Sequence, residues 1–207
     1  MRQVMKQGAR PLRLVARLSA ALAVLVLAAC SMGRTGVMPV MLDLGAPQVD
    51  ALAASTSAPA RPALVLEAVQ AAPLLTDTLV IWREAGSSEP HGYQGYRWVA
   101  TPASLVDQRL RERLSVGGPV LAQDLTGAMP HLQVRLERFE QIYTPESGSS
   151  QAHVVLSGLW FGAGQAPRQF RFDQVQDVSG TGAVAGVQAL ALALERAMQQ
   201  VEGWLQD

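Results

Sequence analysis

Apolar side chains recur at helical spacing in the last part of the chain. The series comprises Val184, Val187, Ala191, Leu194, Met198, Val201 and Leu205. Intervals of three and four residues place them on one face of an α-helix, so the pattern predicts an amphipathic helix over residues 184–205. We expect this helix to pack across a β-sheet. The alternative, a coiled-coil seam, is at the short limit for that signal because it has only three heptads.

A second helix is predicted to begin at Thr101-Pro102. Threonine is a good N-cap, and proline is favoured at the first helical position. The helix should run to about Leu114 and end before Gly117-Gly118-Pro119. Its buried stripe is expected to comprise Val106, Leu110 and Leu114. Its solvent-exposed side is expected to comprise Arg109, Arg111, Glu112 and Arg113, with an i,i+4 ion pair between Asp107 and Arg111.

Period-two alternation and short apolar runs predict strands over much of the remaining chain. The expected strands cover residues 38–44, 63–70, 79–83, 93–99, 132–143, 152–161 and 168–175. Residues 79–99 then form a β-hairpin, and the last three strands form an antiparallel meander with a bulge before Phe139. The predicted fold class is therefore α+β, a mostly antiparallel sheet with two main helices packed on one side, the second of them C-terminal.

Residues 1–29 have the composition of a secretory signal. Five basic residues and no acidic residue precede Cys30, and residues 18–29 form an unbroken run of small or apolar side chains. A helix of that length spans about 18 Å, which is too short for the ~30 Å hydrocarbon core of a membrane. A basic segment followed by a short apolar run is typical of a signal peptide.

The apolar run ends in Leu27-Ala28-Ala29-Cys30, which resembles the bacterial lipobox. The resemblance implies cleavage before Cys30 and lipidation of Cys30 by a thioether-linked diacylglycerol and an N-acyl chain such as palmitate. Ser31 follows, where an aspartate favours inner-membrane retention in enterobacterial lipoproteins. We therefore expect sorting toward the outer membrane, with the protein facing the periplasm.

The expected layout has three parts. Residues 1–29 are the signal peptide, residues 30–37 a lipidated tether, and residues 38–207 a single domain with a flexible loop at 45–62. The loop is predicted from its Ala, Ser, Thr and Pro content. The eight tether residues reach ~27 Å at most, so the domain stays close to its membrane.

The charge balance excludes some partners. Of the 17 basic residues five precede Cys30, so the remaining chain has 12 basic against 17 acidic residues, a net charge of −5. A modestly acidic body lacks the basic footprint of a nucleic-acid-binding protein. It also lacks the charge for broad adhesion to anionic lipids. Membrane association is therefore expected through the lipid anchor alone.

Candidate catalytic chemistry is sparse. His91, His131 and His153 lie far apart without metal-ligand spacing, and the chain has no nucleophile-elbow, zincin or phosphate-loop motif. The single cysteine excludes an intramolecular disulfide and a cysteine-based metal site. We therefore expect a non-enzymatic protein with no metal and no cofactor besides the covalent lipid on Cys30.

Tyr96-Arg97-Trp98 is the most distinctive polar-aromatic cluster. One interpretation is a packed tryptophan whose neighbouring arginine pairs with an acid or covers a ring. The other is a partner-contact surface, because tyrosine, arginine and tryptophan dominate interface hot spots. Consecutive strand residues face opposite ways, so we expect Trp98 to be buried and Arg97 to be accessible.

Several short segments, taken in order, carry a family resemblance. They are Leu27–Cys30, Val40–Leu44, Ala72–Leu75, Leu79–Arg83, Tyr96–Trp98, Leu132 with Phe139, and Trp204-Leu205. Together they resemble the ABC-type transport auxiliary lipoprotein family. The resemblance implies a non-enzymatic component of an intermembrane lipid transport system, with an MCE-domain protein and an ABC transporter complex as partners. Some members assemble as rings, so a homo-oligomer is also an expectation.

Two other classes of protein remain open. One is a general envelope scaffold that binds peptidoglycan or other proteins. The other is a lipid-anchored enzyme, which would need a pocket of converging polar groups that the sequence does not display. Identification of the proteins that co-purify with the solubilised lipoprotein would separate the three classes.

Overall fold

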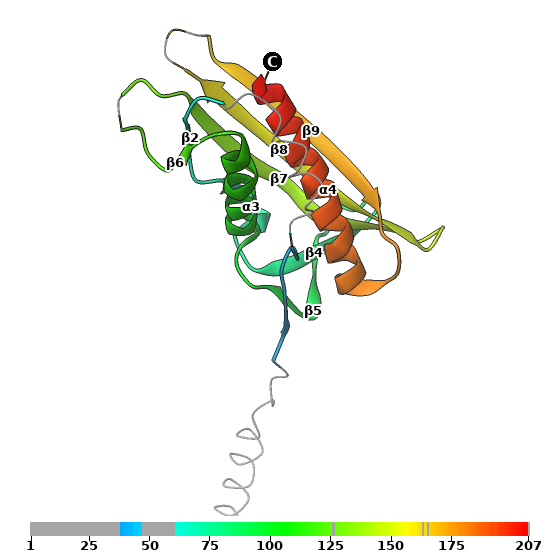
Figure 1. The fold of residues 1–207 in the computed structure, drawn as a ribbon. Coiled ribbons are helices and arrows are strands. Elements are labelled where there is room, and N and C mark those ends of the chain that lie inside the picture. Colours follow the sequence, from blue (N-terminus) through cyan, green and yellow to red (C-terminus); the bar gives the residue numbers. More distant parts are fainter. Residues whose placement is uncertain (1–37, 47–60, 126, 163, 165, 207) are drawn as a thin grey trace, which may run out of the picture. The chain divides into compact units, whose positions relative to one another are not determined.

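Nine β-strands and two α-helices occur in the part of the chain that the structure describes (Figure 1). This computed structural model describes residues 38–46, 61–125, 127–162, 164 and 166–206. Pro39–Asp207 forms one compact unit, and the predicted α+β fold class is confirmed. The signal peptide, Cys30, Ser31 and residues 47–60 of the predicted loop lie outside the described residues.

Three long strands form the predicted antiparallel meander. They are β7 (His131–Thr144), β8 (Ser149–Phe161) and β9 (Arg168–Asp177). The register of β7 against β8 shifts between Leu136 and Arg138, which confirms the bulge before Phe139. Because one extra residue is inserted there, Leu136 and Phe139 both enter the core although they are three residues apart.

Shorter strands extend the sheet from the other edge of β7. They are β1 (Val40–Leu42), β2 (Leu64–Leu66), β3 (Gln70–Ala71), β4 (Leu79–Glu84), β5 (His91–Trp98) and β6 (Val120–Leu121). β4 and β5 form the expected antiparallel hairpin, but β2, β3 and β4 each pair with β7 in parallel. The sheet is therefore mostly, but not purely, antiparallel. The strands that pair with β7 in parallel all precede it in the chain by long connections, because parallel neighbours cannot be joined by a tight turn.

The predicted strand over residues 63–70 is divided. β2 ends at Leu66, and the backbone N–H of Val69 donates to the Asp107 carboxylate (3.1 Å) instead of to a neighbouring strand. The chain rejoins β7 only at β3. A short 3-10 helix, η2 (Pro73–Leu75), follows β3 and begins at a proline.

The helices α3 (Pro102–Gly117) and α4 (Gly182–Gln206) lie on one face of the sheet, as predicted (Figure 1). The Thr101 side chain accepts a hydrogen bond from the backbone N–H of Ser104, so the predicted N-cap is confirmed. The expected buried stripe of α3 is also confirmed: Val106, Leu110 and Leu114. Arg111 pairs with Asp107 at 2.7 Å, as the spacing predicted.

The prediction for the polar side of α3 is wrong at two positions. Arg109 and Arg113 are only 8% and 7% exposed. Both guanidinium groups pair with Glu195 of α4, at 2.8 Å and 3.2 Å. That side of α3 faces the second helix, and a helical pattern read from α3 alone does not reveal a neighbouring element with complementary charge.

The C-terminal helix packs across the sheet, as expected, but its buried face is wider than the predicted stripe. Leu190, Leu194 and Met198 are fully buried, while Val184 is 47% exposed and Ala191 is only half-buried. The prediction is therefore wrong at Val184. Small residues let the helix backbone approach the sheet closely, which brings further positions into the interface: Ala183, Gly186, Ala189, Ala193 and Ala197.

Gly158 in the centre of β8 supports a testable prediction. It pairs with Val134 on one side and Phe170 on the other. A methyl group at this position would overlap the Phe170 ring and the backbone carbonyl oxygen of Gln133, which cannot move without distorting the strand ladder. Gly158→Ala should lower the free energy of unfolding by about 1–3 kcal/mol, measured by denaturant titration.

The control for this substitution is Gly203→Ala in α4, where an added methyl group meets no atom within 4 Å. This variant should unfold at the same or slightly higher denaturant concentration, because alanine is the better helix former. Equal stability of the two variants would contradict the close packing inferred at Gly158.

Candidate functional site

Trp98 lies at the end of β5, directly before α3. Its ring is buried and packs against Phe139, with ring centroids 5.3 Å apart. The indole N–H is buried without a hydrogen-bond partner among the described residues. Trp98 therefore belongs to the core, as the alternation of β5 predicted.

Arg97 faces away from that core and is half-buried. Its Nη1 atom donates to the backbone carbonyl of Tyr96 (2.7 Å) and to that of Tyr93 (3.4 Å), so the guanidinium group is folded back along its own strand. Tyr96 is also half-buried and meets Tyr93 edge to face, at 6.4 Å between centroids. Arg97 is thus partly accessible and does not project freely.

An apolar rim borders Arg97 at the open edge of the sheet. β1 pairs with β5 in parallel, which places Met41 opposite Arg97. Val40, Met41 and Val99 are each about half exposed. These four residues, Val40, Met41, Arg97 and Val99, form what we call the β1 edge surface. The sequence pattern identified only Arg97, because exposed apolar residues on an edge strand look like the core residues of an internal strand.

Tyr93 lies nearer the start of β5 than Arg97. Its hydroxyl donates to the Oε1 atom of Gln141 (2.8 Å), and Gln141 in turn donates to Ser150 (2.8 Å). Burial raises the pKa of the Tyr93 hydroxyl, so it stays protonated and keeps its role as a donor. These bonds hold β5, β7 and β8 together beneath the start of α4.

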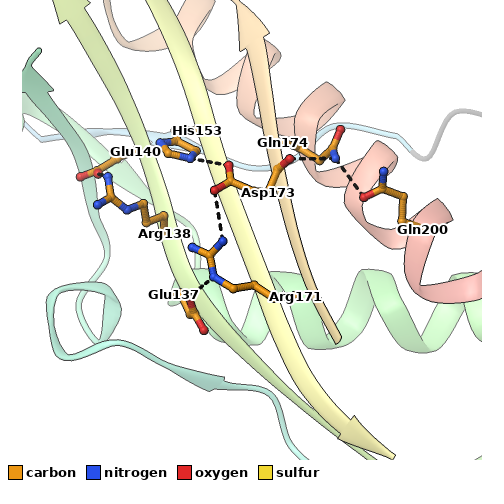
Figure 2. A network of polar contacts seen from close by, with 8 residues as sticks. All are labelled: Glu137, Arg138, Glu140, His153, Arg171, Asp173, Gln174 and Gln200. Carbon is orange, nitrogen blue, oxygen red and sulfur yellow. Dashed lines mark hydrogen bonds and ion pairs between the residues drawn. The ribbon is translucent and has the colours of Figure 1, made fainter. Parts of the chain in front are cut away.

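The face of β7–β9 opposite the helices, which we call the outer face, carries a network of charged side chains (Figure 2). Its members are Arg83, Glu137, Arg138, Glu140, His153, Arg171 and Asp173. Glu140 is the most deeply placed member, at 3% exposure. It accepts from Arg83 at 2.7 Å and from Arg138 at 3.4 Å, which compensates the burial of its charge.

Asp173 is the centre of the second half of the network (Figure 2). It accepts from Nε2 of His153 at 2.6 Å and pairs with Arg171 at 3.3 Å, while Arg171 also contacts Glu137 at 3.2 Å. Burial raises the pKa of Asp173, but the bonds and charges of His153 and Arg171 outweigh it, so the pKa lies below its ordinary value. The ionised carboxylate therefore supports the sheet until the pH falls through that lowered pKa.

Each carboxylate of the network is engaged by a guanidinium or imidazole group. The network joins four strands, β4, β7, β8 and β9, and its charges nearly balance. Sequence reasoning missed it because strand alternation predicts which residues face outward, but not which residues of separate strands lie opposite one another.

The other two histidines have local partners. His91 stacks on Trp82 with centroids 4.7 Å apart, and His131 stacks on Phe161 at 5.2 Å and lies 3.3 Å from Glu67. Across the described residues, the structure has no group of three or more His, Cys, Asp or Glu side chains arranged to hold a metal ion.

The fold and these surfaces define a two-layer α+β domain whose helices cover one face of a mixed sheet and whose other face carries paired charges. The sequence matches the pattern of the ABC-type transport auxiliary lipoprotein component over residues 43–202. The chain therefore belongs to the ABC-type transport auxiliary lipoprotein family, as the sequence resemblance indicated. Membership identifies a transport-associated lipoprotein of the cell envelope.

Two solved structures have a similar fold. Protein XCC0632 of Xanthomonas campestris, assigned to family DUF330, has a TM-score of 0.62 and 19% identity, with 72% of this chain and 86% of that chain covered. An uncharacterised protein also gives a TM-score of 0.62, at 14% identity, with coverage of 81% and 99%. At these identities the likeness concerns the fold alone. No curated protein matches the sequence significantly.

Within the residues that the structure describes, neither α3 nor α4 is long and apolar enough to cross a membrane.

Proposed function

We propose that this protein is a periplasm-facing, non-enzymatic component of an MCE/ABC-type intermembrane lipid transport system. In this role it is anchored through acylated Cys30, sorted to the outer membrane, and docks its partners at the membrane surface. The observation that carries the proposal is the family match over residues 43–202, which spans nearly the whole described domain. The family is an auxiliary component of ABC-type transport, which supports a transporter as partner.

The structure supports docking through local contacts. The charges of the outer face are mostly paired, and the body has a net charge of −5, so bulk electrostatic attraction contributes little. The β1 edge surface instead offers half-exposed apolar side chains at the edge of the sheet, with Met41 directly opposite Arg97. Apolar contacts around an arginine are typical of an interface hot spot.

Co-purification tests the proposal directly. The full-length lipoprotein, tagged at its C-terminus and solubilised in a mild non-ionic detergent, should retain an MCE-domain protein and subunits of an ABC transporter. Mass spectrometry of the retained proteins, compared with an unrelated tagged lipoprotein, identifies them. Retention of peptidoglycan-associated proteins alone would favour the scaffold class and overturn the proposal.

Arg97→Ala is expected to weaken capture of the MCE-type partner about fivefold or more, which corresponds to ~1 kcal/mol. The folded state should be nearly unaffected, because among the described residues the guanidinium group bonds only to carbonyl groups of its own strand. Arg196→Ala is the matched control, since Arg196 is exposed on α4 and far from β5 in the sequence. Partner affinity and thermal unfolding are measured on the same preparations.

Two results would contradict a partner-contact role for Arg97. One is a large loss of thermal stability with unchanged affinity per folded molecule. The other is an equal loss of affinity in the Arg196→Ala control, which would reflect net charge only.

A further inference from the structure

A trough of about 600 Å³ crosses the outer face of the meander. Its lining consists of three consecutive residues from each long strand, 133–135, 157–159 and 169–171, together with Gln70 of β3. Strand pairing arranges the nine residues into three rows that run across the sheet. The middle row is Val134, Gly158 and Phe170, whose side-chain positions face the helices, so its backbone forms the floor.

The two outer rows form the walls of the trough, and one of them is basic. Arg135 lies opposite Ser157, and Ser157 lies opposite Arg171, so the Ser157 position lies between two arginine positions on neighbouring strands. Neighbouring strands are ~4.8 Å apart, which puts the two arginine backbones about 10 Å apart. Arginine side chains from both sides can therefore reach one ligand above Ser157.

The two arginines differ in how they are held. Arg171 is fixed by Glu137 and Asp173, which engage its Nε and Nη1 atoms. Arg135 is exposed and forms no side-chain hydrogen bond or ion pair with any residue that the structure describes. One guanidinium group is thus positioned in advance, and the other retains all its donors for a ligand.

The opposite wall is uncharged. It consists of Gln133, Leu159 and Gln169, of which Leu159 is an exposed apolar side chain. Gln133 is held by Glu67 through a bond of 2.9 Å. A ligand in the trough therefore meets two arginines on one side, of which Arg135 has the unpaired charge among the described residues, and amide groups with an apolar contact on the other.

We propose that the trough binds an oxyanion, a phosphate or a carboxylate, between Arg135 and Arg171 above Ser157. Guanidinium groups bind both kinds of oxyanion with paired hydrogen bonds, and the Ser157 hydroxyl adds a further donor. The group is either a free anion or the head of an anionic lipid whose apolar part contacts Leu159. This site is independent of the transport partners, so its test and the co-purification test can fail separately.

Calorimetric titration of the purified full-length lipoprotein in non-ionic detergent tests the site. The probes are inorganic phosphate, dihexanoyl phosphatidic acid and the uncharged dihexanoylglycerol. Phosphate-bearing probes should bind and dihexanoylglycerol should not. Phosphatidic acid binding at least tenfold tighter than inorganic phosphate identifies a lipid head as the ligand, and similar affinities identify a free oxyanion.

Arg135→Gln should weaken binding of the phosphate-bearing probes at least tenfold without loss of stability, because the Arg135 side chain has no hydrogen-bond or ion-pair partner among the described residues. Arg196→Gln, which removes the same charge from an exposed position on α4, should bind like the unsubstituted protein. Absence of binding by any phosphate-bearing probe would overturn the proposal. Equal affinities of the two variants would also overturn it, because the attraction would then be a property of net charge.

Discussion

Glu195→Ala is expected to destabilise the fold by about 3 kcal/mol, near the lower end of the range for breaking a buried ion pair. The two carboxylate oxygens of Glu195 accept from Nη1 of Arg109 at 2.8 Å and from Nη1 of Arg113 at 3.2 Å. The side chains of all three residues are at most 14% exposed. Removing the carboxylate leaves both guanidinium groups buried with fewer partners.

The loss of stability in Glu195→Ala should come mainly from Arg109, which is left with the weaker partners. Arg113 keeps a second carboxylate, Glu202, at 3.0 Å. Among the described residues, Arg109 keeps only the backbone carbonyl of Gly45 and a weak contact to Glu112 at 4.0 Å. A double-mutant cycle between Glu195 and Arg109 should therefore give a larger coupling energy than one between Glu195 and Arg113.

Thermal and urea unfolding of the purified lipoprotein measure the loss. For a domain of this size, about 3 kcal/mol corresponds to a fall in Tm of roughly 6–12 °C. Glu112→Ala is the matched control, because Glu112 is 48% exposed on the same surface of α3. Its removal should change stability by no more than ~0.5 kcal/mol. Similar losses in the two variants would show that the helix interface does not depend on this ion pair.

The same residues show why part of the fold was predictable from the sequence and part was not. Local signals were sufficient for the Thr101 N-cap, the α3 stripe and the bulge before Phe139, because each depends on residues a few positions apart. The burial of Arg109 depends on Glu195, which lies 86 positions away on another helix. Without other information, an arginine on a helix is expected to face solvent. Only the placement of α4 shows that Arg109 is buried in an ion pair.

The candidate sites show a similar division. Alternation along β5 was enough to separate the buried Trp98 from the partly accessible Arg97. The row of Arg135, Ser157 and Arg171 required the register between three strands, which no single segment specifies. The half-exposed Met41 beside Arg97 required the parallel pairing of β1 with β5. Surfaces made from several strands were therefore not accessible to sequence reasoning.

Cys30→Ser is expected to abolish lipid anchoring completely. The thioether bond to diacylglycerol requires the thiol of Cys30, and the resemblance to the lipobox places cleavage directly before this residue. Each buried methylene of an acyl chain contributes about 0.8 kcal/mol to membrane binding, and stable anchoring needs at least two chains. Without them, the predicted tether no longer holds the domain near its membrane, and docking loses the high local concentration that anchoring provides.

Metabolic labelling with an alkyne fatty acid, followed by fractionation and gel analysis, measures this outcome. The Cys30→Ser protein should carry no label and should accumulate with residues 1–29 still attached. Any membrane-bound fraction should consist of that longer precursor. Ser31→Ala is the matched control, because it alters the neighbouring residue and preserves the thiol, so it should be cleaved and labelled normally. The opposite outcome would be a Cys30→Ser protein that is still cleaved after residue 29 and still labelled. Lipidation would then occur elsewhere, and the tether predicted over residues 30–37 would be wrong.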